Sequence, residues 1–310
     1  MAEEPSLLLP RPLTPGSTVG VCAPAGPVDE KTLDVGIRWL EDAGYVVRCG
    51  RHLRARHGYL AGTDEQRLED LLELWRAPDV RGIVLARGGY GLPRILSRLD
   101  PSELRRGRKL VVGYSDATSL LLYLRRRAGL ASVHGPMLEQ PDLTPGARAQ
   151  LLALVRGEAS ALEPLKGAGL VGGRVAGPLV GGGLVLVAGS LGTPWEIDTR
   201  GAILFLEEIC EQPYAIDRLL VQLREAGKLR DAAGVALGQF VSCESERYPE
   251  TSVEDVLREV LVSEVKGPVV EDLPFGHTLD PRSLGFGVRA ELDGDRGTLT
   301  PLEPVVEGRD

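Results

Sequence analysis

Ser115 stands where the sequence predicts that a buried strand turns into a helix. The apolar run Leu110–Val112 is typical of a short strand, Gly113–Asp116 supplies turn residues, and leucines after Ala117 predict a helical face. A bend of this kind lifts a serine hydroxyl clear of a sheet and points the next backbone N–H at a developing oxyanion. The match to G-x-S-x-G is partial because Ala117 replaces the second glycine. An N-cap serine in an ordinary turn therefore stays open as the alternative.

A carboxylate and an imidazole further along the chain could complete a hydrolytic site. Glu207 and Glu208 follow the apolar segment Ala202–Leu206, and His277 lies in a loop after another apolar segment. A serine, a histidine and an acid from three strand ends can form a triad in which the histidine takes the hydroxyl proton. The alternatives are a solvated loop histidine and a strand-end charge in solvent. For His134 we expect structural support of a turn.

Alternating strands and helices over the first 130 residues predict the scaffold that positions these groups. We expect strands at Thr18–Ala23, Tyr45–Val47, Gly82–Leu85 and Leu110–Val112, with helices capped at Asp29 and Thr63. This alternation is typical of a parallel, doubly wound sheet, whose ligands bind at the carboxyl ends of the strands. Ser115 and the glycine-rich segment Arg87–Gly91 both fall at such ends.

The Arg87–Gly91 segment does not follow the G-x-G-x-x-G pattern of a dinucleotide site. We interpret it as backbone brought close to a substrate, and a simple tight turn is the alternative.

Proline and glycine between Pro141 and Gly167 predict a boundary. We divide the chain into an N-terminal domain, residues 1–145, a linker, residues 146–168, and a C-terminal domain, residues 169–310. The last part contains short apolar runs with glycine breaks, such as Gly177–Val180 and Gly181–Leu186, and mixes strands with helices. We expect a second, mixed α/β domain.

Composition excludes several classes of protein. The 310 residues carry a formal net charge of −8, which argues against non-specific nucleic-acid binding. Four scattered cysteines without a CxxC pair predict reduced thiols, and we expect neither a metal ion nor a cofactor. The acidic start Met1–Pro5 is unlike a signal peptide, and no apolar run reaches the length of a membrane span. The sequence therefore predicts a cytoplasmic protein that does not bind membranes.

Eight short motifs follow one another in order over nearly the whole chain. They are Cys22-Ala23-Pro24-Ala25-Gly26, Ala86-Arg87-Gly88-Gly89-Tyr90-Gly91, Gly113-Tyr114-Ser115-Asp116, His134-Gly135-Pro136-Met137, Leu191-Gly192-Thr193-Pro194, Leu204-Phe205-Leu206-Glu207-Glu208, Ile216-Asp217-Arg218 and Gly276-His277-Thr278. In this combination the chain resembles the LD-carboxypeptidase family of serine peptidases, which includes murein tetrapeptide carboxypeptidases and the microcin C self-immunity peptidase. The resemblance implies a flavodoxin-like N-terminal domain that holds the nucleophile and a C-terminal domain that supplies a glutamate and a histidine.

Carried over motif by motif, the resemblance implies which residues form the site. Ser115 would be the nucleophile, His277 the base and Glu207 the orienting acid, followed by the second acidic residue Glu208. The backbone N–H groups of Gly89 and Asp116 would form the oxyanion hole. Arg87, beside that loop, is a candidate for substrate binding. The chain departs from its relatives at Gly183, where they usually have asparagine.

The resemblance implies a metal-independent serine carboxypeptidase that cleaves an L,D peptide bond. Its substrate would be the cytoplasmic murein tetrapeptide, which loses its terminal D-alanine during cell-wall recycling, and the protein would be a homodimer. Two alternatives remain open. One is hydrolysis of the peptide–nucleotide bond of a microcin-C-like toxin, and the other is a non-catalytic module that binds muropeptides.

Overall fold

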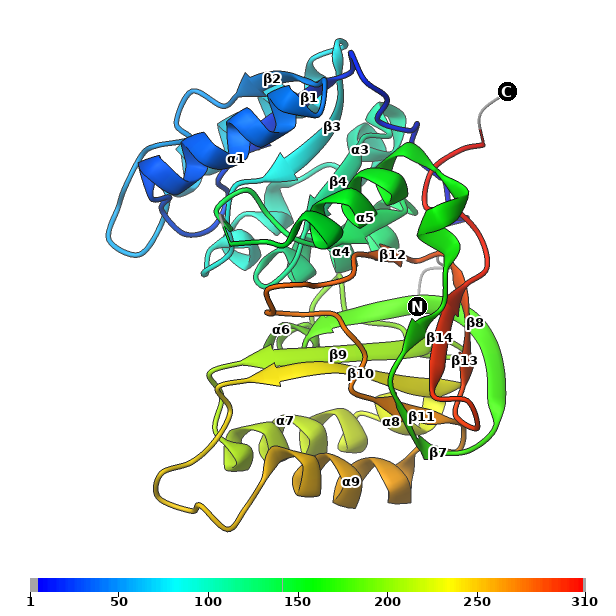
Figure 1. The fold of residues 1–310 in the computed structure, drawn as a ribbon. Coiled ribbons are helices and arrows are strands. Elements are labelled where there is room, and N and C mark those ends of the chain that lie inside the picture. Colours follow the sequence, from blue (N-terminus) through cyan, green and yellow to red (C-terminus); the bar gives the residue numbers. More distant parts are fainter. Residues whose placement is uncertain (1–4, 141, 309–310) are drawn as a thin grey trace.

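The chain forms two sheets that lie next to one another in the computed structural model, which describes residues 5–140 and 142–308 (Figure 1). The first sheet has the strand order β12-β5-β4-β3-β1-β2, and the second has the order β6-β14-β13-β8-β9-β10-β11-β7. Residues 1–4 of the segment compared with a signal peptide lie outside the described residues. Both sheets are flanked by helices, so the expected α/β class is confirmed.

The first sheet has the flavodoxin-like order that the resemblance implied. Its strands β1 to β5 are mutually parallel and have the bounds Thr18–Cys22, Val46–Cys49, Val80–Leu85, Leu110–Gly113 and Ser132–His134. The connecting helices α1 to α4 have the bounds Glu30–Asp42, Asp64–Arg76, Pro101–Gly107 and Ala117–Tyr123. Two short 3-10 turns, Leu92–Arg94 and Leu96–Arg98, lie between β3 and α3.

The predicted caps of the first two helices are confirmed. The Asp29 side chain accepts a hydrogen bond from the backbone of Thr32 at the start of α1. Thr63 and Gln66 form a reciprocal capping box at the start of α2. Each cap satisfies backbone N–H groups that have no partner inside the helix.

The second sheet is mixed. Its strands β6 to β11 have the bounds Leu165–Lys166, Ala168–Val171, Arg174–Gly183, Ile203–Ile209, Gly234–Val241 and Val269–Glu271, and β13 and β14 those of Arg289–Asp293 and Thr298–Pro301. Strands β8, β9, β10 and β11 are parallel, whereas the strands on both sides of them pair antiparallel. Its helices α6 to α9 have the bounds Leu184–Gly189, Pro213–Glu225, Lys228–Asp231 and Val253–Glu264, and α7 and α9 cover the face away from the first sheet (Figure 1).

The glycine-separated runs of the second half do not form separate strands. Strand β8 continues through Gly181 and Gly182, and α6 begins directly at Leu184. Both glycines have positive φ values, 153° and 133°, a conformation that glycine adopts without a steric penalty. The polypeptide can therefore turn from strand to helix without an intervening loop.

Two segments tie the halves of the chain together in a way that the sequence did not predict. Strand β12, Leu284–Phe286, comes from the C-terminal half but pairs antiparallel with β5 of the first sheet. Helix α5, Pro145–Arg156, starts at the predicted boundary, and its Leu151 and Leu154 pack with Val19 and Val84 of the first sheet. The loop that carries His277 thus runs from β11 in the second sheet to β12 in the first.

Helix α4 and strand β8 pack closely where the two sheets meet. A Cβ atom on Gly182 would lie 2.4 Å from the Thr118 side chain, and the Gly183 N–H donates to Thr118 Oγ1 at 3.3 Å. The same buried cluster includes Leu121 of α4 and Phe205 of β9. The junction is therefore part of one continuous core.

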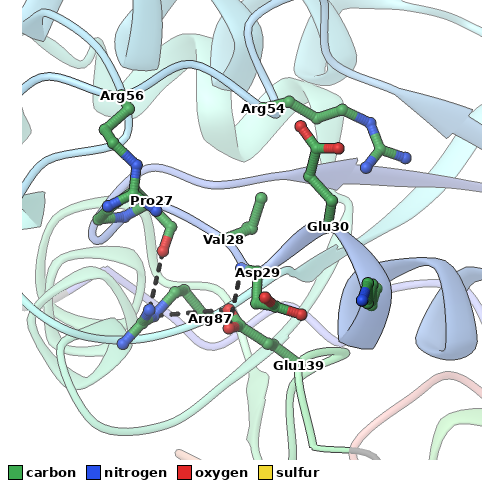
Figure 2. Close-up of a pocket in the computed structure, with 9 residues that line it drawn as sticks. Pro27, Val28, Asp29, Glu30, Arg54, Arg56, Arg87 and Glu139 are labelled. Carbon is green, nitrogen blue, oxygen red and sulfur yellow. Dashed lines mark hydrogen bonds and ion pairs between the residues drawn. The ribbon is translucent and has the colours of Figure 1, made fainter.

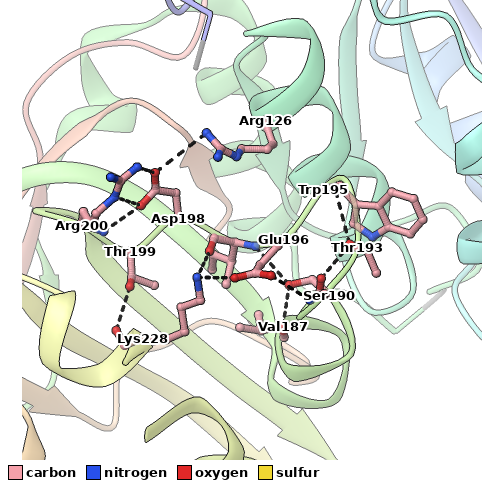
Figure 3. A network of polar contacts seen from close by, with 12 residues as sticks. Arg126, Val187, Ser190, Thr193, Trp195, Glu196, Asp198, Thr199, Arg200 and Lys228 are labelled. Atoms are coloured by element: carbon pink, nitrogen blue, oxygen red, sulfur yellow. Dashed lines mark hydrogen bonds and ion pairs between the residues drawn. The ribbon is translucent and has the colours of Figure 1, made fainter. Parts of the chain in front are cut away.

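A polar network covers another part of this junction (Figure 3). Lys228 Nζ lies 2.7 Å from Glu196 Oε1, and the Arg126 guanidinium, which follows α4, lies 3.9 Å from Asp198. Asp198 is also paired with Arg200, and these hydrogen bonds and ion pairs hold the pKa of Asp198 down at about 2. The network anchors the segment after α6 against the first half.

None of the helices in residues 5–140 and 142–308 has the length and hydrophobicity needed to span a bilayer.

The close approach at Gly182 generates a prediction about stability. In Gly182→Ala the new methyl group meets Thr118 and forces a residue with a Cβ atom into a positive φ. We expect the free energy of unfolding to fall by about 2 kcal/mol or more, measured by urea denaturation. Gly189→Ala is the matched control, because a Cβ atom there has nothing within 4 Å. An equal effect of both substitutions would contradict this explanation.

Candidate active site

Ser115 occupies a sharp bend between β4 and α4. Its φ is 59°, a left-handed conformation that is unusual for a residue with a side chain and is common at functional turns. The departure from G-x-S-x-G has a steric explanation. A Cβ atom on Gly113 would lie 2.8 Å from the Ala117 methyl, so the first glycine leaves the room that the alanine needs.

His277 is held by a buried carboxylate. Its Nδ1 lies 2.7 Å from Oε2 of Glu207, whose side chain is fully buried. The imidazole also packs on Tyr114, with 4.4 Å between the ring centroids. The sequence placed Glu207 after the end of its strand, whereas it lies inside β9, because pairing with β8 and β10 continues past Leu206. The rigid strand therefore fixes the carboxylate.

Ser115 and His277 line the same pocket, although they come from different halves of the chain. The pocket has a volume of about 190 Å³, and its other lining residues are Arg87, Gly88, Gly89, Tyr114, Met137, Glu139 and Gln140. The sequence-predicted residues Ser115, His277, Gly89 and Arg87 thus meet here, with Glu207 behind the imidazole. Tyr114, Glu139 and Gln140 also line the pocket but were not predicted from the sequence. Two of the motifs could have indicated them. Tyr114 lies within the motif Gly113–Asp116, and Glu139 and Gln140 follow closely after the motif His134–Met137.

The glycine-rich loop lies directly against the serine. A Cβ atom on Gly88 would be 2.8 Å from Ser115 Oγ, so a larger residue would collide with the hydroxyl. The Gly88 carbonyl accepts a hydrogen bond from Gly26 N–H at 2.9 Å. Gly89 has a φ of 104°, which again favours glycine.

The side chain of Asp116 ties this loop to the elbow. Its Oδ2 accepts from the backbone N–H of Leu92 at 2.8 Å, and Arg67 donates to the carbonyl of Gly91 at 2.9 Å. Burial raises the pKa of Asp116 to about 6, while hydrogen bonds and Arg67 act in the opposite direction. For Asp116 we expected only a backbone role, and nothing in the sequence pattern pointed to Arg67.

His134 lies behind the pocket and not in a turn. It is the last residue of β5, it is 1% exposed, and its ring packs edge-on against Phe205 and Tyr114. Burial lowers its pKa to about 4, so the imidazole is neutral near pH 7. Its surroundings indicate a packing role beneath Tyr114 and His277.

The side chain of Glu208 contacts α6, whereas that of Glu207 contacts His277. Its Oε2 accepts a hydrogen bond from Val185 N–H at 2.8 Å, in the first turn of α6. Burial raises the pKa of Glu208 to about 7. Glu208 thus satisfies a helix N-terminus and has no contact with His277 among the hydrogen bonds of the described residues.

Gly183 lies next to the carboxylate that holds His277. A Cβ atom on Gly183 would be 3.5 Å from Glu207 Oε1, and that buried oxygen has no hydrogen-bond partner among the described residues. An asparagine here, the residue that the resemblance led us to expect, would place its side-chain amide close to this oxygen.

Arg87 contacts backbone and acid on the wall of the pocket. Its Nη1 donates to the carbonyl of Pro27 at 2.8 Å, and its Nε lies 3.6 Å from Glu139 Oε2. Within the described part of the chain, no group of three or more His, Cys, Asp or Glu side chains is placed to hold a metal ion.

Comparison with known proteins gives the same class for both halves of the chain. Residues 19–135 match the LD-carboxypeptidase N-terminal domain, and residues 176–292 match the LD-carboxypeptidase C-terminal domain. A probable murein peptide carboxypeptidase from Bacillus subtilis is 40% identical over 96% of both chains. The chain belongs to the LD-carboxypeptidase family.

Solved structures agree with this assignment. The muramoyltetrapeptide carboxypeptidase from Oxalobacter formigenes is 32% identical, has a TM-score of 0.80, and is matched over 91% of this chain and 97% of its own. MccF in complex with glutamyl sulfamoyl guanosine has a TM-score of 0.87 over 97% of this chain and 100% of its own. At 22% identity the second likeness concerns the fold alone.

The free Glu207 oxygen generates a prediction at Gly183. We expect Gly183→Asn to raise the free energy of unfolding by about 1 kcal/mol, because the side-chain NH₂ of the asparagine would donate a hydrogen bond to Glu207 Oε1 and its side chain would be a better N-cap for α6. The φ of −59° at this position is accessible to any residue. Gly183→Ala, which adds the Cβ atom without a donor, is the control, and equal stability of the two variants would refute the assigned hydrogen bond.

The raised pKa of Glu208 generates a prediction about pH. Between the ordinary value of 4.5 and the folded value of about 7, the folded state binds more protons, so stability is lost as the pH rises through this window. From about pH 5 to about pH 8, wild type should lose on the order of 3 kcal/mol more than Glu208→Gln. Urea titrations across this range measure the difference. The raised pKa of Asp116 contributes equally in the two proteins. If the stability of both proteins changed with pH in parallel, the pH dependence could not be assigned to Glu208.

Proposed function

We propose that this protein is a serine carboxypeptidase that hydrolyses an L,D peptide bond. The observation that carries the proposal is the meeting of Ser115, in its strained elbow, with the His277–Glu207 pair at one pocket. Nucleophile, base and orienting acid are the three groups that such hydrolysis needs. Family membership supports the same reaction.

The geometry suggests a role for each member. The Nδ1–H of His277 donates a hydrogen bond to Glu207 and keeps its proton, which leaves Nε2 free to accept the proton of the Ser115 hydroxyl as the serine oxygen attacks the scissile carbonyl. The imidazolium then gives this proton to the leaving amine, and an acyl-enzyme on Ser115 remains. Water, deprotonated by His277, releases the acid and restores the hydroxyl. Burial of Glu207 keeps its charge directed at the imidazole.

The oxyanion would be stabilised by the backbone N–H groups of Gly89 and Asp116. Gly89 lies in the loop that touches Ser115, and Asp116 follows the serine at the N-cap of α4, the position that supplies an oxyanion donor in a nucleophile elbow. The Asp116 and Arg67 contacts would hold the two donors at a fixed separation. Arg87, on the pocket wall, is suited to bind the terminal carboxylate.

The substrate that we propose is a murein tetrapeptide, which would lose its terminal D-alanine. Relatives that are named murein peptide carboxypeptidase and muramoyltetrapeptide carboxypeptidase support this choice. With such a substrate the protein would act in the cytoplasm, in the recycling of cell-wall peptides, and as a homodimer like the family to which it belongs.

A second candidate function is the same serine-dependent hydrolysis with a different leaving group, a nucleotide amine in place of D-alanine. The Escherichia coli microcin C7 self-immunity protein MccF is 26% identical over 96% of this chain, so a peptide–nucleotide amide is the alternative substrate. Incubating the purified protein with both compounds, and comparing kcat/KM, distinguishes the two.

Exchange of the proposed nucleophile and acid tests the catalytic roles. Ser115→Ala should abolish D-alanine release and labelling by a fluorophosphonate probe. Glu207→Gln should lower kcat by about 10³-fold with a smaller change in KM, because the amide no longer stabilises the imidazolium. Release of D-alanine, quantified by chromatography, is the readout.

Glu208→Gln is the matched control, since it changes the neighbouring carboxylate, which does not contact His277. We expect its kcat to stay within about threefold of wild type at neutral pH. Turnover by Ser115→Ala, or equal losses in Glu207→Gln and Glu208→Gln, would disprove the assignment. Binding of the tetrapeptide without labelling or turnover in wild type would identify a non-catalytic binding module.

A further inference from the structure

The imidazole of His277 makes two different contacts. Its Nδ1 lies 2.7 Å from Oε2 of Glu207, and its ring lies against the phenol ring of Tyr114, with 4.4 Å between the centroids and an angle of 48° between the ring planes. A single hydrogen bond restrains one ring atom, whereas a contact between rings also restrains the ring plane. The two contacts together therefore determine the direction in which Nε2 points.

Tyr114 is itself firmly held. It is 5% exposed, and it belongs to the elbow that carries Ser115. Its hydroxyl oxygen accepts a hydrogen bond from Nε2 of Gln140 at 2.5 Å. Gln140 is oriented in turn, because its Oε1 accepts from the backbone N–H of Met137 at 2.9 Å. His134 packs edge-on against the same phenol ring, so the ring is a fixed surface for the imidazole.

The contact with Tyr114 bears on the charge of His277 as well as on its orientation. The face of an aromatic ring attracts a cation that lies within about 6 Å of its centroid, and the imidazole lies within this distance. In the proposed reaction the imidazole becomes an imidazolium when it accepts the serine proton. The attraction is stronger for this charged form than for the neutral ring, and such differential stabilisation lowers the barrier.

The ionisable groups around His277 act on it in other ways. Glu207 contacts Nδ1, at the edge of the imidazole. Burial lowers the pKa of His134 to about 4, so this ring is neutral near pH 7. Arg87 and Glu139 line the same pocket, but they lie 3.6 Å from one another and their charges compensate (Figure 2). The ring contact is therefore supplied by Tyr114.

We propose that Tyr114 is a positioning residue for His277, whose ring fixes the plane of the imidazole and stabilises the imidazolium that forms as Ser115 attacks. Gln140 keeps the phenol ring in place through its hydroxyl. Tyr114 thus acts through the histidine and needs no contact with the substrate. The inference rests on the proposed function, because it takes His277 as the base.

Titration of His277 tests the electrostatic part of the proposal without turnover. The chain has four histidines, so isotope-labelled imidazoles can be followed by NMR as the pH is varied, and His277→Gln assigns the signal. Tyr114→Phe is compared with a protein that carries a trifluorinated phenylalanine at the same position. Fluorination preserves the approximate shape of the ring and weakens its negative face.

We expect Tyr114→Phe to keep the titration midpoint of the His277 signal within about 0.2 pH units of wild type, since the ring face remains. In the fluorinated protein the imidazolium loses stabilisation and releases its proton more readily. Its midpoint should therefore lie about 0.5 pH units or more below that of Tyr114→Phe.

Release of D-alanine tests the consequence for catalysis. From Tyr114→Phe to the fluorinated protein, kcat should fall about threefold with little change in KM, and the acidic limb of the pH profile of kcat should move to lower pH together with the NMR midpoint. Tyr114→Leu, which removes the ring, should lower kcat by about tenfold or more. A merely structural role of the ring would not couple the two midpoints.

Tyr123→Leu is the matched control. Tyr123 is 4% exposed, its hydroxyl donates to the carbonyl of Leu99, and its ring packs on Trp195 instead of His277. This substitution should leave the His277 midpoint unchanged even where it lowers stability. Equal midpoints for Tyr114→Phe and its fluorinated analogue would overturn the inference, and so would a similar shift in Tyr123→Leu.

The two proposals fail separately. A wild-type protein that neither releases D-alanine nor reacts with the fluorophosphonate probe would disprove the proposed function, and the NMR midpoints would still confirm or overturn the stabilisation of the imidazolium by Tyr114. Turnover by wild type, with midpoints that do not respond to fluorination, would overturn the role of Tyr114 alone.

Discussion

The hydrogen bond between His277 and Glu207 constrains the rest of the site. A carboxylate that is fully buried must have a strong partner, since burial of an unpaired charge is costly. Glu207 meets this need with the Nδ1 of His277 at 2.7 Å, and β9 allows it little freedom to move. The imidazole is therefore held from behind by a rigid element, and only its far side faces the pocket of Ser115.

Ser115 and His277 are held in place in different ways. Ser115 depends on a local bend with a positive φ, which the loop contacts of Asp116 and Gly88 keep in place. His277 lies in a loop, but the strands on both of its sides are paired, one in each sheet. The site can exist only while both sheets keep their relative position, and the packing of α4 on β8 provides that constraint.

Much of the fold and of the site could be predicted because the signals are local. Apolar runs located β1, β3 and β4, side-chain caps located α1 and α2, and motifs identified Ser115, Glu207 and His277 as residues of one site. Contacts distant in sequence could not be predicted in this way. The residues around Leu284 give no sign that this segment pairs with β5, since its partner, His134, lies about 150 residues earlier in the chain. The end of β9 was misplaced for the same reason: its pairing partners, not its own residues, extend it past Leu206.

Strand β12 has a consequence for how the protein can be divided. Without it, β5 would become the border of the first sheet, with an unpaired row of backbone N–H and C=O groups that invites association with other chains. The C-terminal half of the chain thus supplies β12, an edge strand of the first sheet. Division of the chain between the two matched regions would expose this edge of β5, so we expect the N-terminal region to associate with other chains when it is produced without the C-terminal region.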